Sequence, residues 1–460
     1  MLQAANENIM TKPHLTVEQP YTLVVGLGVT GMSVVRYLHD SGNNIVVVDS
    51  RDQPPGREAL SKNFPDVELF AGDFDTDIFI KAKNIIVSPG VSVMEPALQA
   101  ARAKGVKISG DIDLFAREIA VPVIGITGSN GKSTVTALVT TMAERAGIDV
   151  AMGGNIGTPA LDLISEEHEL YVLELSSFQL ETMEDLVVEV AVILNISPDH
   201  LDRYDSFDSY VLSKRAIYAH ARKIVVNRDD VQVSREIPEC ERVIGFTLNV
   251  PGEMSAADDF GVCEHSGEKW LCHGKEMLLP ASRLKIKGQH NVANALASLA
   301  IGAAMGFPGD AMLDALVNFR GLDHRTQWVA DINGVHWFND SKGTNVGASV
   351  AAIEGLPGLH VLIAGGEGKK ADFGPLKLVA KKHLRAVVLI GRDADMIEKA
   401  LCGEVPVRHA SDMKDAVIAA AELAQPGDNV LLSPACASFD MYRNFEHRGE
   451  VFMQAVLGLA

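Results

Sequence analysis

Short apolar runs alternate with longer amphipathic stretches along nearly the whole chain, and glycine-rich loops separate many of them. Apolar runs of this kind predict buried strands, and apolar residues that recur every three or four positions predict helices. The alternation therefore predicts parallel sheets covered by helices, which is an α/β fold. The clearest strand signals cover residues 21–25, 45–48, 85–87, 121–126, 171–175, 190–196, 335–338, 360–364, 386–390 and 429–432.

Apolar stripes place several helices between these strands. Val135, Leu138, Val139 and Met142 form one stripe, and Gly147 can end that helix. Further helices are predicted over residues 207–222, 289–305 and 412–424, and another that carries Val34, Val35 and Leu38 ends near Gly42.

The length of 460 residues exceeds one ordinary hydrophobic core, so two or three domains are expected. The strand–helix alternation restarts near residue 112 and again after residues 321–325, which we interpret as a hinge. We predict a Rossmann-like N-terminal domain (21–111), a central phosphate-loop domain of ATPase type (112–321) and a Rossmann-like C-terminal domain (322–460). Residues 1–20 are polar and without pattern, and we expect them to form a loose extension.

The stretch from Val123 to Thr134 has the layout of a phosphate-binding loop: a buried strand, three glycines, Lys-Ser-Thr and then a helix. Glycines allow backbone N–H groups to surround phosphate oxygens, and the helix N-terminus adds positive charge. In such a loop Lys132 reaches the β- and γ-phosphates, and Ser133 or Thr134 binds Mg²⁺. Ile126 stands where the strict motif has a glycine, so a glycine-rich turn with a surface lysine remains the alternative.

A complete G-x-G-x-x-G from Gly26 to Gly31 follows the first strand, and Asp49 ends the second strand. This is the dinucleotide fingerprint in its usual context, but the same turn serves any ligand with a pyrophosphate. A nicotinamide dehydrogenase and a purely structural Rossmann turn both remain open. The loop around Ser88 follows another buried strand, and loops at this edge of a sheet line the ligand crevice.

Glu174 lies near the end of a strand that we expect to neighbour the phosphate loop. An acid in that place is the usual partner of Mg²⁺, although a strand-end glutamate can also be a structural hydrogen-bond acceptor. Asp199 and His200 follow the next strand, where His200 is either a metal ligand or a satisfied loop histidine. Lys214 falls on the inward stripe of the helix over residues 207–222, as either a partnered buried lysine or a snorkelling one.

Asn291 and Asn294 lie one turn apart at the start of a long apolar helix. Their amides suit the edge of an adenine ring, and capping of the helix is the alternative reading. Lys369 and Lys370 follow a glycine loop at a strand end, which favours an anion site over a solvated turn.

The net charge of −19 argues against nucleic acid or an anionic membrane as the main partner, because both require basic surface. The five cysteines are scattered, odd in number and without a C-x-x-C, so we expect reduced thiols in a cytoplasmic protein rather than a disulfide framework or zinc site. No run of 18 apolar residues occurs, and we expect no membrane insertion.

Taken together, these stretches resemble the Mur ligase family of peptidoglycan synthesis, and most closely its D-glutamate-adding branch. The Asp-Asn-Pro-Arg stretch of the diaminopimelate-adding branch is absent. Gly343 departs from the expected alanine, and Pro198 precedes the Asp-His pair. The resemblance covers residues 26–448 and rests on Gly-Ile-Thr-Gly-Ser-Asn-Gly-Lys-Ser-Thr, Gly-Gly-Asn-Ile-Gly, Glu-Leu-Ser-Ser-Phe-Gln-Leu-Glu, Asp-His-Leu-Asp-Arg-Tyr, His-Asn-Val-Ala-Asn-Ala, Asn-Asp-Ser-Lys-Gly-Thr-Asn and Ser-Pro-Ala-Cys-Ala-Ser.

The resemblance implies roles for individual positions. For the UDP part of a nucleotide-sugar and its acceptor end it implies Val29, Thr30, Asp49, Ser50, Ser88, Gly90 and Asn155. For ATP it implies Gly128, Ser129, Asn130, Gly131, Lys132, Ser133, Thr134, Asn291, Asn294, Arg325 and Asp340. For D-glutamate it implies Lys342, Thr344, Lys369, Ser438 and Phe445. For two Mg²⁺ ions it implies Ser133, Glu174, His200 and a carbamate formed from Lys214 and CO₂, and it makes Lys132, Glu174, His200 and Lys214 the catalytic set.

The resemblance also implies the reaction: an ATP-dependent ligase that adds D-glutamate to UDP-N-acetylmuramoyl-L-alanine through an acyl-phosphate. It implies a cytoplasmic enzyme, and we expect a monomer. A ligase of the same kind with another amino-acid specificity is the nearest alternative. A nucleotide-regulated binding protein without catalysis would also explain both glycine loops, whereas a dehydrogenase would leave the phosphate loop without a function.

Overall fold

The computed structural model describes residues 19–252, 256–257 and 259–459. The predicted loose extension, residues 1–20, therefore falls almost wholly outside the described residues. The chain divides into two compact units. The first contains residues 1–120, 153–166 and 175–187, and the second contains 121–152, 167–174 and 188–460.

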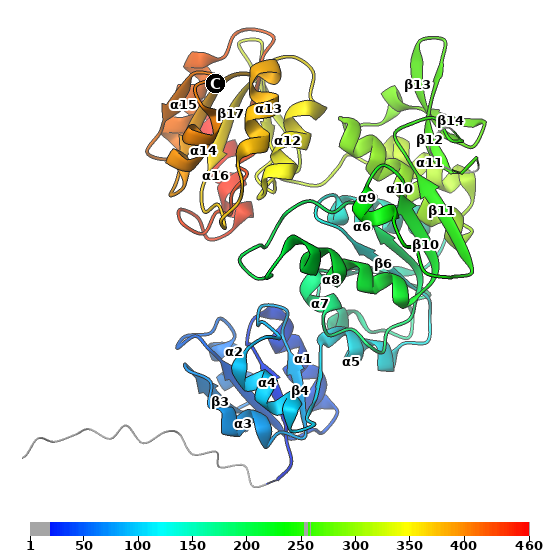
Figure 1. Cartoon of the computed structure of the whole chain (residues 1–460), viewed down its shortest axis with the longest axis vertical. Helices are drawn as coiled ribbons and strands as arrows, with labels where there is room; N and C mark the ends of the chain where they lie inside the picture. The colour runs from blue at the N-terminus through cyan, green and yellow to red at the C-terminus, as the bar shows by residue number, and fades with distance from the viewer. Residues whose placement is uncertain (1–18, 253–255, 258, 460) are drawn as a thin grey trace, which may run out of the picture. The chain divides into compact units, whose positions relative to one another are not determined.

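The first unit is built on a five-stranded parallel sheet in the order β3-β2-β1-β4-β5, drawn in blue in Figure 1. The chain leaves β1 toward β2 on one side and later reaches β4 on the other, which is the strand order that opens a ligand crevice at the strand ends. The strands are β1 (Thr22–Val25), β2 (Ile45–Asp49), β3 (Glu68–Ala71), β4 (Asn84–Val87) and β5 (Lys107–Ser109). The helices are α1 (Val29–Asp40), α2 (Arg57–Asn63), α3 (Thr76–Ile80), α4 (Pro96–Ala103), α5 (Asp111–Glu118), η1 (Ala160–Leu163) and α7 (Ser177–Leu180).

The second unit contains a nine-stranded sheet in the order β14-β13-β12-β11-β10-β9-β6-β8-β7. Strand β6 pairs in parallel with β8 and β9, while β12, β13 and β14 form antiparallel hairpins at one edge. The strands are β6 (Val123–Thr127), β7 (Val150–Gly154), β8 (Leu170–Glu174), β9 (Val188–Ile193), β10 (Ala221–Asn227), β11 (Arg242–Phe246), β12 (Phe260–His265), β13 (Glu268–His273) and β14 (Glu276–Pro280). The helices are α6 (Lys132–Arg145), α8 (Phe207–Ala219), α9 (Val231–Ser234), η2 (Ala281–Arg283), α10 (Gln289–Met305) and α11 (Gly309–Asn318).

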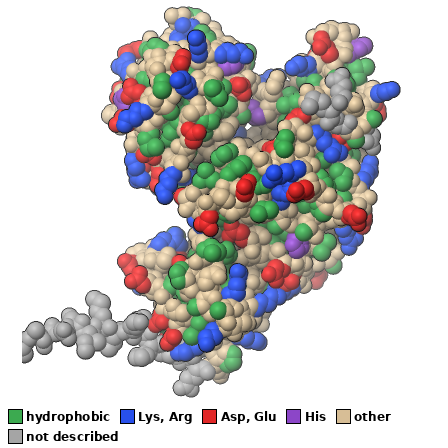
Figure 2. Space-filling view, viewed as in Figure 1, with side chains coloured by type: hydrophobic (Ala, Val, Ile, Leu, Met, Phe, Trp, Pro, Cys, Tyr) green, Lys and Arg blue, Asp and Glu red, His purple; other side chains and the backbone are tan. Residues whose placement is uncertain are grey.

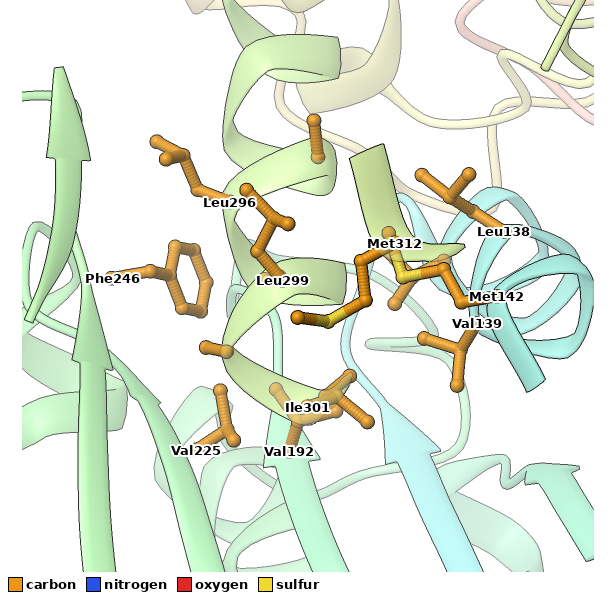
Figure 3. Packing of buried hydrophobic residues seen from close by; sticks show 14 of the residues in the cluster. Leu138, Val139, Met142, Val192, Val225, Phe246, Leu296, Leu299, Ile301 and Met312 are labelled. Carbon is orange, nitrogen blue, oxygen red and sulfur yellow. The ribbon is translucent and has the colours of Figure 1, made fainter. Parts of the chain in front are cut away.

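The core of this sheet is formed where α6 and α10 cover it. Leu138 and Met142 of α6 and Leu299 of α10 are buried together with Val192 of β9 (Figure 3). These apolar stripes anchor the N-termini of both helices at the same sheet, and those N-termini carry the phosphate loop and the Asn291–Asn294 pair.

A six-stranded sheet in the order β15-β16-β20-β17-β18-β19 completes the second unit. It is parallel except for β15, which pairs antiparallel to β16. Its strands are β15 (Gln327–Ile332), β16 (Val335–Asn339), β17 (His360–Gly365), β18 (Leu384–Ile390), β19 (Val407–His409) and β20 (Asn429–Leu432). Its helices are α12 (Val346–Gly355), α13 (Gly374–His383), α14 (Ala394–Leu401), α15 (Met413–Leu423) and α16 (Phe445–Leu457).

Most predicted elements are confirmed, and α10 has the predicted bounds. The predicted helix over 207–222 is wrong at its end, because α8 stops at Ala219 and residues 221–227 form β10. Ile224, Val225 and Val226 are three consecutive buried residues, which suits a strand buried on both faces and not the continuation of an amphipathic helix. Strand β15 was not predicted, since its residues are only half-buried or exposed.

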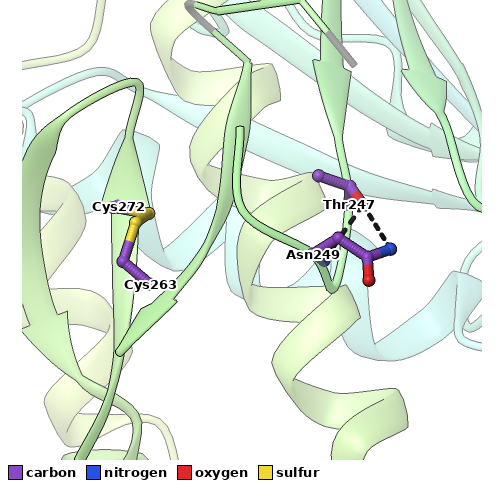
Figure 4. Close-up of a disulfide and its surroundings, with 4 residues drawn as sticks. All are labelled: Thr247, Asn249, Cys263 and Cys272. Atoms are coloured by element: carbon purple, nitrogen blue, oxygen red, sulfur yellow. Dashed lines mark hydrogen bonds between the residues drawn. A yellow bond between two sulfur atoms is a disulfide. The ribbon is translucent and has the colours of Figure 1, made fainter. Parts of the chain in front are cut away.

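The expectation of reduced thiols throughout is wrong for two cysteines. Cys263 of β12 and Cys272 of β13 form a disulfide (Figure 4). The hairpin register pairs Cys272 with Gly261, so Cys263 is a diagonal neighbour of Cys272 on the same face. The separation of nine residues between the two cysteines in the sequence does not reveal this register. Cys240, Cys402 and Cys436 are free.

Acidic and basic side chains are mixed over the face that Figure 2 presents. In the part of the chain that the structure describes, no helix combines the length and the apolar character needed to cross a membrane.

Candidate active site

The phosphate loop lies between β6 and α6. Gly131 precedes the first helical residue with φ of 85°, a left-handed conformation that favours glycine. A Cβ at this position would lie 2.5 Å from Oδ1 of Asn294, so the glycine also allows the loop to approach α10. The loop therefore has the close packing of a phosphate site, and it lies at the N-terminus of α6, where the first N–H groups of a helix lack intrahelical partners.

Lys132 lies at this loop and does not extend from the surface. Its Nζ donates hydrogen bonds to the carbonyls of Gly128 (2.8 Å) and Ser129 (3.0 Å). Desolvation by burial lowers the pKa of Lys132, while the charges of Glu174 and Asp199 act in the opposite direction. Lys132 is therefore half-buried against its own loop and is not a fully exposed surface lysine.

Ser133 connects three parts of the chain at the start of α6. Its Oγ donates a hydrogen bond of 2.6 Å to Oε2 of Glu174, the last residue of β8, and accepts one of 2.5 Å from Nη2 of Arg325. Ser133 and Glu174 are both buried. A serine hydroxyl and a carboxylate at this distance are the hard oxygen donors that Mg²⁺ prefers.

A network that the sequence did not reveal holds the loop in place. The Asn195 amide accepts from the backbone N–H of Asn130 at 2.9 Å and donates to its carbonyl at 3.0 Å. The hydroxyl of Ser129 donates to the carbonyl of Ser197 (2.9 Å) and lies 2.9 Å from the hydroxyl of Tyr210. The only signals for these residues were their positions after β9 and on the inward stripe of α8.

Lys214 is buried, with an exposed fraction of 2%, so the snorkelling alternative is wrong. Its Nζ donates to the carbonyl of Gly128 at 3.1 Å, the same oxygen that accepts from Lys132, and lies 4.9 Å from the ring centre of Tyr210. Burial and the positive charge of Lys132 hold the pKa of Lys214 well below its ordinary value.

His200 follows Asp199 in the turn after β9. Its Nε2 lies 3.7 Å from Oδ2 of Asp199, and desolvation lowers its pKa although the Asp199 charge opposes this. Nζ of Lys369 lies 4.0 Å from Oδ1 of the same aspartate. The turn thus places an imidazole, a carboxylate and an ammonium group close together.

The predicted ATP residues outside the loop line one pocket with it. Asn291, Asn294, Arg325 and Asp340 contribute to this pocket together with Gly131 and Thr134, and further lining comes from Asn227, Phe246, His290 and Thr326, which were not predicted. Asn291 and Asn294 bond to each other at 3.1 Å through Nδ2 of Asn294. The N-cap of α10 is Gly288, and no side-chain hydrogen bond caps this helix. The alternative that the two asparagines cap the helix is therefore not observed.

Asp340 follows β16 at the edge of this pocket. Its carboxylate accepts from Ser433 Oγ at 2.6 Å and from the backbone N–H of Thr326 at 3.0 Å. Desolvation raises the pKa of Asp340 to about 6, although these hydrogen bonds and Arg325 lower it.

The predicted D-glutamate residues follow the carboxyl ends of three neighbouring strands. Thr344 and Lys342 follow β16, Ser438 follows β20, and Lys369 follows β17. Lys342 Nζ lies 3.8 Å from the ring centre of Phe445. Burial and, to a lesser degree, the charge of Arg325 lower the pKa of Lys342 to about 8.

Arg448 of α16 supports two of these loops and was not predicted. Its guanidinium, buried within the fold, donates to the hydroxyl and the carbonyl of Ser341 and to the carbonyl of Cys436. One arginine therefore fixes the loop after β16 against the loop after β20.

A second pocket, of about 510 Å³, lies within the first unit. It opens at the carboxyl ends of β1, β2 and β4, as the strand order requires. All seven residues predicted for the UDP-sugar contribute to its lining: Val29, Thr30, Asp49, Ser50, Ser88, Gly90 and Asn155.

Asp49 is engaged by protein groups inside this pocket. Its carboxylate accepts from the backbone N–H of Leu27 at 2.7 Å and from Arg51 at 2.8 and 2.7 Å. Burial alone would raise its pKa, but the hydrogen bonds from Arg51 and Leu27 outweigh it and hold the pKa below its ordinary value. Asp49 therefore shapes the pocket wall, and Arg51, which was not predicted, is a basic group on that wall.

A phosphate loop with a serine–glutamate pair, an asparagine-lined nucleotide pocket and a Rossmann-like crevice define a multidomain nucleotide-dependent protein. The chain belongs to the Mur ligase family. The model described as "Mur ligase MurD-like, N-terminal domain" matches residues 20–110, "Mur ligase middle domain" matches 126–302, and "Mur ligase, glutamate ligase domain" matches 324–436.

Two relatives that match over nearly their full length carry the same name. The chain is 52% identical over 438 residues to the UDP-N-acetylmuramoylalanine–D-glutamate ligase of Nitrosococcus oceani, covering 95% of this chain and 96% of that protein. It is 52% identical over 451 residues to the ligase of the same name from Pseudomonas putida, covering 97% and 99%.

Solved structures share the fold at low sequence identity. The UDP-N-acetylmuramate-alanine ligase of Thermotoga maritima superposes with a TM-score of 0.58 at 18% identity, covering 96% of this chain and 100% of that one. The MurF ligase of Thermotoga maritima in complex with ADP superposes with a TM-score of 0.60 at 15% identity, covering 96% of each chain. The three-domain α/β architecture is that of the family.

Proposed function

We propose that this chain is an ATP-dependent ligase that joins D-glutamate to UDP-N-acetylmuramoyl-L-alanine through an acyl-phosphate. The observation that carries the assignment is the 52% identity over 95% of the chain to a relative named for this reaction. The hydrogen-bonded phosphate loop, with Lys132 and the Ser133–Glu174 pair, supports the use of ATP.

In the first step the L-alanine carboxylate attacks the γ-phosphorus of ATP, the bond to the β-phosphate oxygen breaks, and ADP leaves. Two anions must approach each other, so positive groups have to screen them. Lys132, Arg325 and the N–H groups at the start of α6 supply that screening from the protein. Removal of one such donor typically lowers the rate by about 10²- to 10³-fold.

We assign one Mg²⁺ position to Ser133 and Glu174 and a second to His200 together with Lys214. Bound there, Mg²⁺ would supply further screening between the carboxylate and the triphosphate. The buried hydroxyl–carboxylate pair suits a hard cation.

Lys214 fits a carbamate because its environment disfavours the ammonium form. Two lysine ammonium groups on the single carbonyl of Gly128 repel each other, and Lys214 is the more deeply buried of the two. In its neutral form the amine attacks CO₂, a nitrogen–carbon bond forms and one proton is released. The product is an anion beside Lys132 and the His200 turn.

In the second step the neutral amine of D-glutamate attacks the acyl carbon and forms the carbon–nitrogen bond. The carbon–oxygen bond to phosphate then breaks in the tetrahedral intermediate, phosphate leaves, and the nitrogen releases one proton to solvent. We assign recognition of the D-glutamate carboxylates to Lys342, Lys369, Thr344 and Ser438, with Phe445 packed on Lys342. We assign the UDP-sugar to the pocket in the first unit, which can accept a nucleotide-sized ligand.

We also propose that the enzyme is a monomer and acts in the cytoplasm, where ATP and nucleotide-activated sugars are available. Size-exclusion chromatography with light scattering tests the first statement.

The decisive experiment measures phosphate release from ATP and Mg²⁺ with UDP-N-acetylmuramoyl-L-alanine, with and without D-glutamate. We expect release that requires both substrates, and mass spectrometry should find the D-glutamyl product. L-Lysine and diaminopimelate serve as competing acceptors, and preferred use of either would assign a different specificity. ATP binding without release under any combination would overturn the catalytic assignment.

A further inference from the structure

The first turn of α12 carries a side chain that contacts two parts of the site. Asn345 is the N-cap of this helix, and its Oδ1 accepts from the backbone N–H of Ala348 at 2.8 Å. Its Nδ2 donates to Oδ1 of Asn130 at 3.1 Å and to Oδ2 of Asp199 at 3.2 Å. Asn345 is buried.

The arrangement uses every polar function of the amide. The oxygen is required as the cap acceptor, and the NH₂ group supplies one proton to each of two acceptor oxygens. Aspartate or serine could cap the helix but could not donate in both directions. The choice of asparagine is therefore explained by the two loops that it contacts and not by capping alone.

The two partners come from the loops that bind phosphate and hold His200. Asn195 holds the backbone of Asn130. The side chain of Asn130 is held at both ends, because its Oδ1 accepts from Asn345 and its Nδ2 donates to Oγ of Ser197 at 3.4 Å. Asp199 also accepts from the backbone N–H of His200 at 2.9 Å and faces Lys369 at 4.0 Å. The rotamer of Asp199 thus depends on Asn345.

Gly347 provides an independent observation at the same contact. A Cβ at this position would lie 3.0 Å from Oγ of Ser197 and 3.6 Å from Nδ2 of Asn130. The first turn of α12 consequently packs against the turn after β9 at a distance that suits glycine.

We propose that Asn345 is a positioning residue. It fixes the side chains of Asn130, in the phosphate loop, and of Asp199, in the His200 turn, relative to the adjacent loop that carries Thr344. The proposal rests on the proposed function, because Thr344 is assigned there to D-glutamate. It gives one residue the task of aligning the phosphoryl-transfer end of the site with the amino-acid end.

The test begins with Asn345→Ser, which keeps a cap acceptor and removes both donors. We expect kcat to fall about 10- to 100-fold. The Kd for ATP, measured without the other substrates, should change less than about twofold. The thermal midpoint should stay within a few degrees of the wild-type value. An unchanged kcat would overturn the proposal.

A double-mutant cycle that exchanges the amide and the carboxylate distinguishes a positioning role from a purely structural one. Asn345→Asp places two carboxylates together, and Asn345→Asp with Asp199→Asn restores a donor–acceptor pair in the opposite sense. We expect Asn345→Asp to cost at least about tenfold in kcat in the wild-type background and less than about threefold in the Asp199→Asn background. Equal losses in both backgrounds would overturn the proposal.

Two further measurements separate this proposal from the proposed function. Wild-type product formation is recorded first, and its absence would overturn the ligase assignment. Hydrogen exchange at the amides of Asn130 and His200 needs no turnover, and Asn345→Ser should accelerate it at both. Asn345→Asp with Asp199→Asn should restore protection at His200, because only the pair with residue 199 is re-formed. If the Asn345 variants fold poorly, Gly347→Ala should lower kcat, because the added Cβ would press on Oγ of Ser197 and displace the first turn of α12. An unchanged kcat in this variant would count against the contact.

Discussion

At the scale of single residues, the chemistry of the site depends on which lysines carry a proton. Lys132 and Lys214 share the Gly128 carbonyl, and burial favours the neutral form of Lys214. Lys342 is also buried, against the ring of Phe445. These three amines are assigned different tasks, so their protonation can be tested separately.

Removal of CO₂ should slow the wild-type enzyme, and added bicarbonate should restore it, because a carbamate at Lys214 needs dissolved CO₂. Lys214→Ala should lose about 10²-fold or more in kcat and should not respond to bicarbonate. Phosphate release in CO₂-free buffer measures the rates. A ¹³C signal from labelled bicarbonate should appear in the wild type and not in the variant, and a signal of equal strength in both would refute the carbamate.

The Michaelis constant for D-glutamate should rise as pH increases through about 8, where Lys342 loses its proton. Below that pH the ammonium group is present and can attract a substrate carboxylate, and above it this attraction is lost. Lys342→Arg should keep a flat KM to higher pH, since a guanidinium stays charged. The same pH dependence in the arginine variant would assign the titration to the substrate amine or to another group.

Sequence reasoning at this scale found side chains with distinctive local patterns. Lys132 was recognised because it follows a glycine loop, and Lys214 was recognised because it lies on the apolar stripe of a helix. Asn195 and Asn345 were not assigned roles, since their importance depends on hydrogen bonds to Asn130, which lies 65 and 215 residues away. Only the folded chain reveals which oxygen such an amide faces.

At the scale of elements, α10 was predicted with its observed bounds, because it is apolar along most of its length and is buried continuously from Asn294 to Gly302. The boundary between α8 and β10 was missed because an amphipathic stripe continues smoothly into an apolar strand. The contact between Cys263 and Cys272 depends on hairpin register, which a one-residue slip would change completely.

Reduction should therefore lower the stability of the second unit. The disulfide closes a short loop, and the chain-entropy estimate for such a loop is about 2–3 kcal/mol. Differential scanning calorimetry with and without a phosphine reductant should show a lower midpoint for the wild type, and Cys272→Ser should match the reduced protein in both conditions. Cys402→Ser, a change at an exposed free thiol, is the control and should behave as the wild type. If the reductant does not change the wild-type midpoint, the disulfide between Cys263 and Cys272 does not form.

At the scale of the whole molecule, the pocket that we assign to the UDP-sugar is assembled from separate segments of chain. Asn155 and Pro159 line it from residues 153–166, while its glycine turn comes from α1 and β1. Asp162 ties these segments together, because it accepts from Ser33 at 2.8 Å and from Arg36 at 2.5 Å.

Asp162→Ala should weaken binding of the UDP-sugar by about 5- to 30-fold, since loss of these hydrogen bonds frees the segment that carries Asn155. The Kd for ATP should not change, because its pocket lies in the second unit. Titration calorimetry with each ligand measures both effects. Asp40→Ala, at an exposed position of the same helix as Ser33, should leave both constants unchanged, and equal weakening by the two variants would contradict this account.

The discontinuous first unit also has a consequence for protein synthesis. Its residues 1–120 leave the ribosome well before residues 175–187, which belong to the same unit. At about 5–20 residues per second, roughly 70 further residues take about 3–14 s to translate. During that interval the nascent sheet lacks part of its native surroundings, including the partners of the buried carboxylates of Asp111 and Asp113, which are Gln179 and the backbone of residues 184–185. The N-terminal unit must therefore complete its folding after β6, β7 and β8 of the central sheet have been synthesised, and chaperones have a defined period in which to act on it.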